Sequence, residues 1–205
     1  MKISILLMLF SLFSVSTCKQ NDEDEIQKTN HSMSIDNELM KTIDKTNATL
    51  NNAKMNGDFD YDFAYLMIMH HQMAIDMSKV QIEKGSDQTI VNMAKGIVAA
   101  QEIEIREMQE FIKKNIIPVK NNEISNSAVI ATEMKSMMSK MHEINLTQNI
   151  DKDYVAMMIP HHETAIAMSK MQIKFGTQND LIQLSKNIVE DQTFEIDEFK
   201  KWQSH

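Results

Sequence analysis

The sequence predicts an all-helical protein, a four-helix bundle built from two duplicated helical hairpins and braced by further helices. Three observations support this prediction. The 205 residues include only 4 Gly and 2 Pro, and 6% are aromatic, whereas sheets need turn residues and draw on aromatic and β-branched side chains. Apolar side chains recur at helical spacing. A segment of about 50 residues also occurs twice, which indicates an internal duplication.

The N-terminal segment is not predicted to be part of the fold. An apolar run over residues 3–13 is too short to span a membrane, so residues 1–17 are interpreted as a signal peptide. Cys18 is the only cysteine, which excludes an internal disulfide. Its position resembles the lipobox of bacterial lipoproteins, in which the cysteine is lipidated; a plain secretory signal with an incidental thiol is the alternative. Residues 18–32 are therefore predicted to be a lipidated cysteine and a polar, flexible tether.

The duplication organises the rest of the chain. The segments 62–111 and 153–202 align without a gap, and roughly two positions in five are identical. We therefore expect a first helical repeat over residues 33–114, a linker over 115–126 and a second repeat over 127–205.

The spacing of apolar residues predicts three helices in each repeat, of which the second and third form a tight hairpin. The expected ranges are 35–55, 60–84 and 86–112 in the first repeat, and 127–144, 153–175 and 177–202 in the second. Gly85 and Gly176 lie where helix C-terminal glycines belong, and Ser86 and Thr177 follow as expected N-caps. Pro160 lies within a helical pattern and predicts either a kink or a helix start.

Two adjacent histidines occupy the same place in each repeat. Successive helix residues differ by about 100°, so His70 and His71 are not expected to bind one ion side by side; they are predicted at opposite edges of the buried stripe. His70 aligns with Met77 two turns later, and His71 lies one turn after Met67. The second repeat preserves these relations in His161, His162, Met158 and Met168. Hydrogen-bonded core histidines are the alternative, but the duplication favours a metal site.

Polar residues also occur on the apolar face of each third helix. These residues are Gln101 and Glu104 in the first repeat, and Gln192 and Glu195 in the second. A buried carboxylate is costly unless it is paired, so we expect each one to accept a hydrogen bond from an imidazole of the neighbouring helix and to orient it. A His–Glu pair that only specifies packing, without a metal, is the alternative.

Side-chain chemistry favours copper as the bound ion. The chain has 19 Met; thioether sulfur suits Cu(I), and imidazole suits either Cu(I) or Cu(II). We therefore predict a protein of the cell envelope that sequesters copper or hands it on, and not an enzyme. A net charge of -8 makes nucleic acid an unfavourable partner.

Two other functions remain open at this point. A ferritin-like di-iron protein requires Glu three residues before the histidine on two helices, but Met67 and Met158 occupy those positions. In a metal-free helical interaction module, the methionines would be ordinary core residues. Self-association is compatible with each of these functions.

The motif "MMIPHHETAIAMSKM", followed by "IVEDQTFEIDEF", resembles the bacterial family known as domain of unknown function 305, and the likeness extends over both repeats. The resemblance implies a ferritin-like helical bundle in exported proteins, some of which bind copper or silver. It implies the paired histidines, with Met77 and Met168, as ligands, and Met67 and Met158 beside them. Together with Cys18, it implies an anchored lipoprotein that faces the periplasm or the cell exterior. The first repeat departs from the motif, with Met69 in place of the proline and Asp76 in place of Ala167.

Overall fold

The computed structural model describes residues 38–115 and 124–204, and within these ranges every regular element is a helix. A helix covers residues 38–51, and the others are α2 (Phe59–Lys84), α3 (Gln88–Lys114), α4 (Ile124–His142), α5 (Ile150–Phe175) and α6 (Asn179–Gln203). The prediction of an all-helical protein is thus confirmed. The predicted signal peptide, Cys18 and the tether lie outside the described residues, as does most of the predicted linker.

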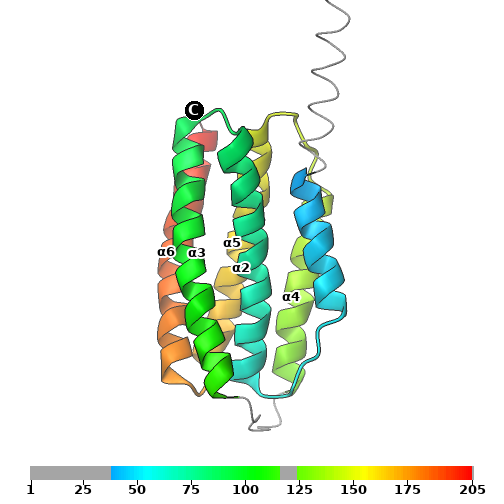
Figure 1. Ribbon diagram of the computed structural model, residues 1–205, viewed down its shortest axis with the longest axis vertical. Coiled ribbons are helices and arrows are strands. Elements are labelled where there is room, and N and C mark those ends of the chain that lie inside the picture. The colour runs from blue at the N-terminus through cyan, green and yellow to red at the C-terminus, as the bar shows by residue number, and fades with distance from the viewer. Residues whose placement is uncertain (1–37, 116–123, 205) are drawn as a thin grey trace, which may run out of the picture.

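The helices form three layers of two (Figure 1). The middle layer is α2 with α5; α3 packs on α2 and α6 packs on α5, which completes the expected bundle of two hairpins. On the other side of the middle layer lie α4, which contacts both α2 and α5, and the helix of residues 38–51. These last two helices are the bracing elements that the repeat pattern predicts.

Because layers cover both sides of α2 and α5, these two helices are buried almost all the way round. All four paired histidines are fully buried, with 0% of their surface exposed. The expectation that they lie at the edges of a buried stripe is therefore wrong, since it assumed one neighbouring layer where there are two. Met134, Met138 and Met141 of α4 are part of the same core.

Gly85 and Gly176 follow the ends of α2 and α5, as predicted. Glycine is needed there because the turn has no room for a side chain. The φ angles of the two glycines are -66° and -67°, which any residue can adopt. A Cβ atom at Gly85 would lie 2.2 Å from Gln81 Nε2 and 2.9 Å from Asp151 Oδ1. The chain therefore needs glycine here because two polar side chains lie against the turn.

The predicted N-caps are wrong by one residue. The caps of α3 and α6 are Asp87 and Gln178, and only Asp87 accepts hydrogen bonds through its side chain, from the backbone N–H groups of the first turn. Ser86 and Thr177 instead donate their hydroxyls to carboxylates of the opposite repeat. Tertiary contacts thus take up the side chains that local spacing assigned to capping.

Two equivalent polar contacts, here called the clasps, fasten each hairpin turn to the other repeat. In one clasp, Asp60 in the first turn of α2 accepts hydrogen bonds from Gln172 Nε2, from the backbone N–H and hydroxyl of Thr177, and from the N–H of Gln178. Asp60 is only 2% exposed. Since the start of α2 meets the end of α5, the two helices run antiparallel.

The second clasp repeats these contacts at the opposite end of the molecule. Asp151 accepts from Gln81 Nε2, from the N–H and hydroxyl of Ser86, and from the N–H of Asp87. The two repeats are therefore related by an approximate two-fold rotation about the middle of α2 and α5.

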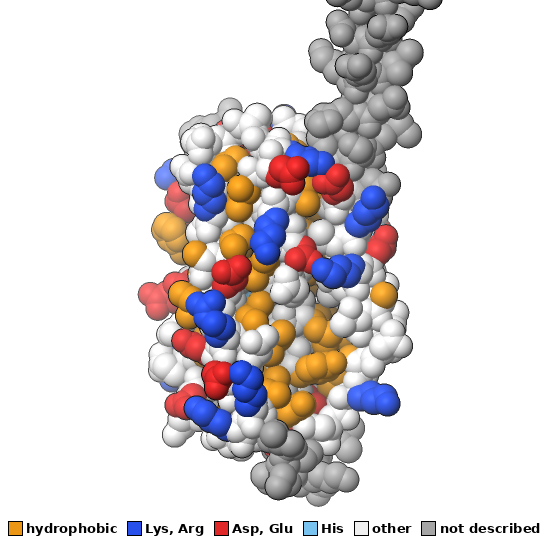
Figure 2. Space-filling model, in the orientation of Figure 1, with side chains coloured by type: hydrophobic (Ala, Val, Ile, Leu, Met, Phe, Trp, Pro, Cys, Tyr) orange, Lys and Arg blue, Asp and Glu red, His pale blue; other side chains and the backbone are white. Residues whose placement is uncertain are grey.

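Two helix boundaries differ from the predicted ones. Helix α5 starts at Ile150 and continues through Pro160, so the alternative of a helix start at Pro160 is wrong. Helix α4 starts at Ile124, which shortens the predicted linker. No helix in the described parts of the chain is long and apolar enough to cross a bilayer. On the face that Figure 2 shows, basic and acidic side chains are interspersed.

Candidate metal site

The histidines of the two repeats meet at the middle of α2 and α5. The ring centroids of His70 and His161 are 3.7 Å apart, and the ring planes are inclined by 34°. His161 Nε2 lies 3.0 Å from the carbonyl oxygen of His70, which indicates the tautomer with the proton on Nε2. The rings of the sequence neighbours His70 and His71 are farther apart, at 6.1 Å. The structure therefore pairs histidines across the repeats, a contact that the sequence patterns did not predict.

The other two histidines face the outer pair of helices. His71 Nε2 lies 2.7 Å from Glu104 Oε2 of α3, and His162 Nε2 lies 2.8 Å from Glu195 Oε2 of α6. Glu104 and Glu195 are the partners that the sequence suggests. Neither contact is a hydrogen bond by its geometry, and both Nε2 atoms are without one among the described residues. Each one is a close contact between a carboxylate and an imidazole.

Many buried polar atoms of α2, α3, α5 and α6 make no hydrogen bond. Within the described residues, the unpartnered atoms include both ring nitrogens of His70, His71 and His162, Nδ1 of His161, and the side-chain amides of Gln101 and Gln192. A buried polar atom without a hydrogen bond costs about 1–3 kcal/mol. This set of imidazole nitrogens is chemically suited to ligate a borderline or soft metal ion.

Burial also keeps the central imidazoles neutral. Burial lowers the pKa of His70 well below its usual value of 6.5, and the nearby imidazoles, His161 first, lower it further. Burial likewise lowers the pKa of His161, with an added contribution from His162. A neutral imidazole has a lone pair to offer, so these two rings can bind metal without first losing a proton.

The four candidate methionines are all fully buried, but they differ in their distance from the histidines along the helix. Met67 precedes His71 by one turn, a rise of about 6 Å, so that one ion can contact both side chains. Met77 follows His70 by seven residues, a rise of about 10 Å. One ion bridges His71 and Met67 more readily than His70 and Met77, and the pairing of His70 with Met77 stays a prediction.

The second repeat makes the same distinction. Met158 precedes His162 by one turn, whereas Met168 follows His161 by seven residues. The favoured ligands are thus three separate pairs, His70 with His161, His71 with Met67, and His162 with Met158. In residues 38–115 and 124–204, no group of three or more His, Cys, Asp or Glu is placed to hold a metal ion. A carboxylate-rich di-iron site is thus not assembled among the described residues.

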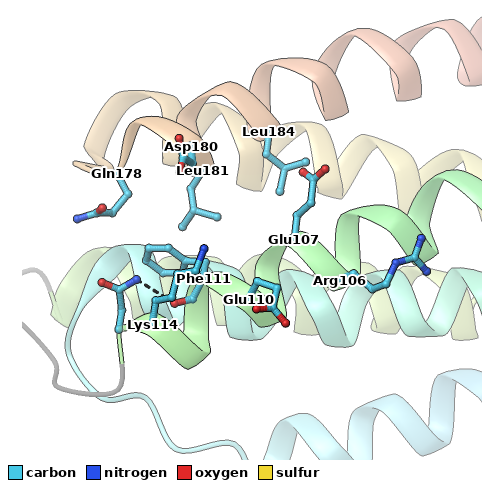
Figure 3. A pocket seen from close by; sticks show the side chains of 10 residues that line it. Arg106, Glu107, Glu110, Phe111, Lys114, Gln178, Asp180, Leu181 and Leu184 are labelled. Atoms are coloured by element: carbon cyan, nitrogen blue, oxygen red, sulfur yellow. Dashed lines mark hydrogen bonds between the residues drawn. The ribbon is translucent and has the colours of Figure 1, made fainter.

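A separate hollow lies where the end of α3 meets the start of α6 (Figure 3). Its volume is about 670 Å³, and its lining combines apolar Phe111, Leu181 and Leu184 with charged residues such as Arg106 and Lys114. None of the predicted site residues lines this hollow, so it is distinct from the histidine centre.

Comparisons with known proteins agree with this architecture. The family model for a domain of unknown function, DUF305, matches residues 11–112 and, a second time, residues 116–203. No curated protein matches the chain.

Solved structures with the same fold include several forms of one metal-binding protein. CopM in its Ag-bound form is 26% identical with a TM-score of 0.54, and the match covers 70% of this chain and 93% of CopM. CopM in its Cu(I)-bound form is 27% identical with a TM-score of 0.54, and the match covers 70% and 94%. A DUF305 protein from Streptomyces coelicolor that is described as secreted is 22% identical with a TM-score of 0.56, and the match covers 71% of this chain and 91% of that protein.

Proposed function

This chain belongs to the DUF305 family, and we propose that it binds copper through the histidines at the middle of α2 and α5, to sequester the ion or to hand it on. Copper is the cargo in this proposal and no substrate is transformed. Support comes from CopM, which has been solved in Ag-bound, Cu(I)-bound and Cu(II)-bound forms. Silver binding is accordingly part of the proposal.

The observation that carries the proposal is the set of buried imidazole nitrogens without partners. A purely structural histidine in a core is held by hydrogen bonds. Here seven ring nitrogens of four fully buried histidines make no hydrogen bond within the described residues. Two of the seven, Nε2 of His71 and Nε2 of His162, lie against the carboxylates of Glu104 and Glu195, and the other five have no polar partner among those residues. We infer that these nitrogens serve a ligand, since apolar side chains would fill the same space at lower cost.

The ligands proposed for the ion are imidazole nitrogens and thioether sulfurs. His70 and His161 supply a neutral pair across the repeats, and His71 with Met67 supplies a pair one turn apart. His162 with Met158 is its equivalent. Glu104 and Glu195 would then orient the imidazoles that they contact. Thioether needs no deprotonation, so such a site holds Cu(I) over a wide pH range.

The cell envelope is the proposed location. We propose that residues 1–17 direct export and that a lipid on Cys18 anchors the protein to a membrane, with the helical domain on the periplasmic or outer side. A Cys18→Ala variant is expected to move from the membrane fraction to the soluble fraction. If it stays with the membrane as the parent protein does, the lipid anchor is wrong.

Competition of the protein with a Cu(I) chelator tests the proposed site. A Met67→Leu/Met158→Leu variant is expected to bind Cu(I) at least tenfold more weakly, because two soft ligands are removed. The matched control is Met77→Leu/Met168→Leu, which changes the same side chains seven residues from the histidines and is expected to bind as the parent does. Leu for Met conserves volume, so both variants should fold.

A second variant, with all four histidines replaced by Asn, is expected to lose Cu(I) binding. Circular dichroism of the variant shows whether its helices remain. Binding by the folded variant equal to that of the parent protein would contradict the proposal, as would parent binding weaker than micromolar.

A further inference from the structure

Two hollows follow each other along the seam between α3 and α6. Helix α3 packs on α2 and α6 packs on α5, whereas α3 and α6 touch each other only slightly. One hollow, of about 620 Å³, joins the first half of α3 to the second half of α6. The other is the hollow of Figure 3, in which Leu181 of α6 lies across from Phe111 of α3. Together they form one groove, here called the outer groove, which extends along α3 from Met93 to Asn115, about 33 Å.

Exposed apolar side chains occur on α3 and α6 at equivalent places in the two repeats. Ile103 of α3 is 50% exposed and Phe194 of α6 is 66% exposed, and the two occupy the same position of the duplicated segment. Phe194 also lines the outer groove, whose lining is apolar at Met93, Phe111 and Leu184 as well. A concave apolar surface with charged residues around it is typical of a contact site for another protein.

The charge of the outer groove indicates which kind of partner fits. Among the described residues, the first hollow is lined by four carboxylates and by no Lys or Arg. Three carboxylates line the second hollow, together with Arg106 and Lys114. The groove is therefore acidic along most of its length, and charge complementarity favours a cationic partner.

The chain itself does not supply such a partner. A second copy carries a net charge of -8, so acidic surface would meet an acidic groove. Residues 1–37, which lie outside the described ranges, contain three Lys and five Asp or Glu, and residues 116–123 contain one Lys and one Glu. Neither segment is cationic, so the occupant belongs to another protein.

We propose that the outer groove binds an amphipathic helix of a partner protein, with apolar side chains on one face and Lys or Arg beside them. A hydrophobic groove takes up such a helix through apolar anchors at positions i, i+3, i+4 and i+7. Phe194 contacts the anchors, and Glu190 and Asp191 pair with the cations. Glu195 lines the groove and lies against His162, so the partner docks beside the candidate metal site. The docking itself requires no copper.

Fluorescence anisotropy of a labelled helical peptide, titrated with the full chain, tests the docking. The probe has about 20 residues, with Leu at the anchor positions and Lys elsewhere. One control peptide has Glu in place of Lys, and a second has Ala in place of Leu. The probe is expected to bind at micromolar concentration, and both control peptides about tenfold more weakly. The proposal is wrong if the probe does not bind, or if either control peptide binds as tightly as the probe.

The apolar part of the groove is tested with one exposed side chain. Phe194→Ser is expected to weaken probe binding about fivefold. The matched control is Val129→Ser, which truncates a side chain that is 45% exposed on α4 in the opposite layer and should bind the probe as the parent protein does. Equal losses in the two variants would place the peptide elsewhere and overturn the proposal. A parent dimer that Phe194→Ser converts to a monomer in sedimentation would make a second copy the occupant and would overturn it too.

The charge of the groove is tested with two exposed carboxylates. Glu190→Gln/Asp191→Asn is expected to weaken probe binding about fivefold at low salt and much less at high salt, because salt screens the attraction. The matched control is Glu133→Gln/Glu143→Gln, which removes two exposed charges from α4 and the residue after it. If this control weakens binding as much, the peptide responds to the net charge of the protein and the outer groove is refuted as its site.

Discussion

A stabilising substitution can be derived from one hydroxyl that the two repeats do not share. Ser78 Oγ and the fully buried Tyr154 OH lie 2.8 Å apart in a hydrogen bond between α2 and α5. The equivalent pair, with the two repeats exchanged, is Ser169 of α5 and Phe63 of α2, and the phenyl ring of Phe63 has no hydroxyl. Accordingly, Ser169 Oγ is buried and has no partner among the described residues. Phe63→Tyr is expected to supply the missing hydroxyl.

The magnitude follows from the hydrogen bond. A neutral intramolecular hydrogen bond contributes about 1 kcal/mol net, and an unpaired buried hydroxyl costs about as much again. Phe63→Tyr should therefore raise the free energy of unfolding by about 1 kcal/mol, which in a domain of this size shifts the Tm upward by about 2–4 °C. Tyr154→Phe should lower the free energy of unfolding by about 1–2 kcal/mol.

Thermal and urea unfolding followed by circular dichroism measure both changes. Phe59→Tyr is the control, because Phe59 is fully buried and packs edge-on against Phe175, so that a hydroxyl added there should destabilise. Should Phe63→Tyr destabilise the protein as much as Phe59→Tyr does, the symmetry argument for the Ser169 contact would be refuted.

Three further predictions concern the stability of the metal-free protein. Asp60→Ala should lower the free energy of unfolding by about 2–4 kcal/mol, because it leaves the buried donors of one clasp without an acceptor; a loss below 1 kcal/mol in urea unfolding would contradict this. His70 and His161 have lowered pKa values in the folded state, so the unfolded chain binds more protons as the pH falls below 6.5. Stability should then be lost with decreasing pH by about 1.4 kcal/mol per pH unit for each histidine, and urea unfolding between pH 5 and 7 should show a shallower dependence in a His70→Leu/His161→Leu variant. Gly85→Ala should destabilise through its clash with the clasp, whereas Gly96→Ala, which meets nothing within 4 Å in the middle of α3, should stabilise by about 0.5–1 kcal/mol; equal Tm shifts for the two would show that the turn has more room than its contacts indicate.

Local patterns were sufficient for the helices and for the duplication. The spacing of apolar residues placed the starts and ends of α2, α3, α5 and α6 within about three residues, because a buried helical face requires that spacing. The hairpin glycines were also placed correctly. The N-caps were not, because Ser86 and Thr177 hydrogen-bond to carboxylates of the other repeat, which no local spacing encodes.

The arrangement of the candidate site was beyond local patterns for a similar reason. Which imidazoles meet depends on how α2 crosses α5, and the sequence of one helix does not contain that angle. A usable sign was nonetheless present. Asp60 and Asp151, like Gln81 and Gln172, are identical polar residues at equivalent positions on helices that bury mostly apolar side chains. Such pairs are candidates for contacts between repeats.

The clasps also determine the smallest unit that can fold. Within one hairpin, the acceptor carboxylate stands at the start of a 26-residue helix, and the turn that needs it stands at the end, about 39 Å away. No hairpin can therefore close its own turn, and each turn is completed only by the other repeat. The chain is in effect a dimer of two similar subunits on a single polypeptide, and its central histidines lie on what would be the subunit interface.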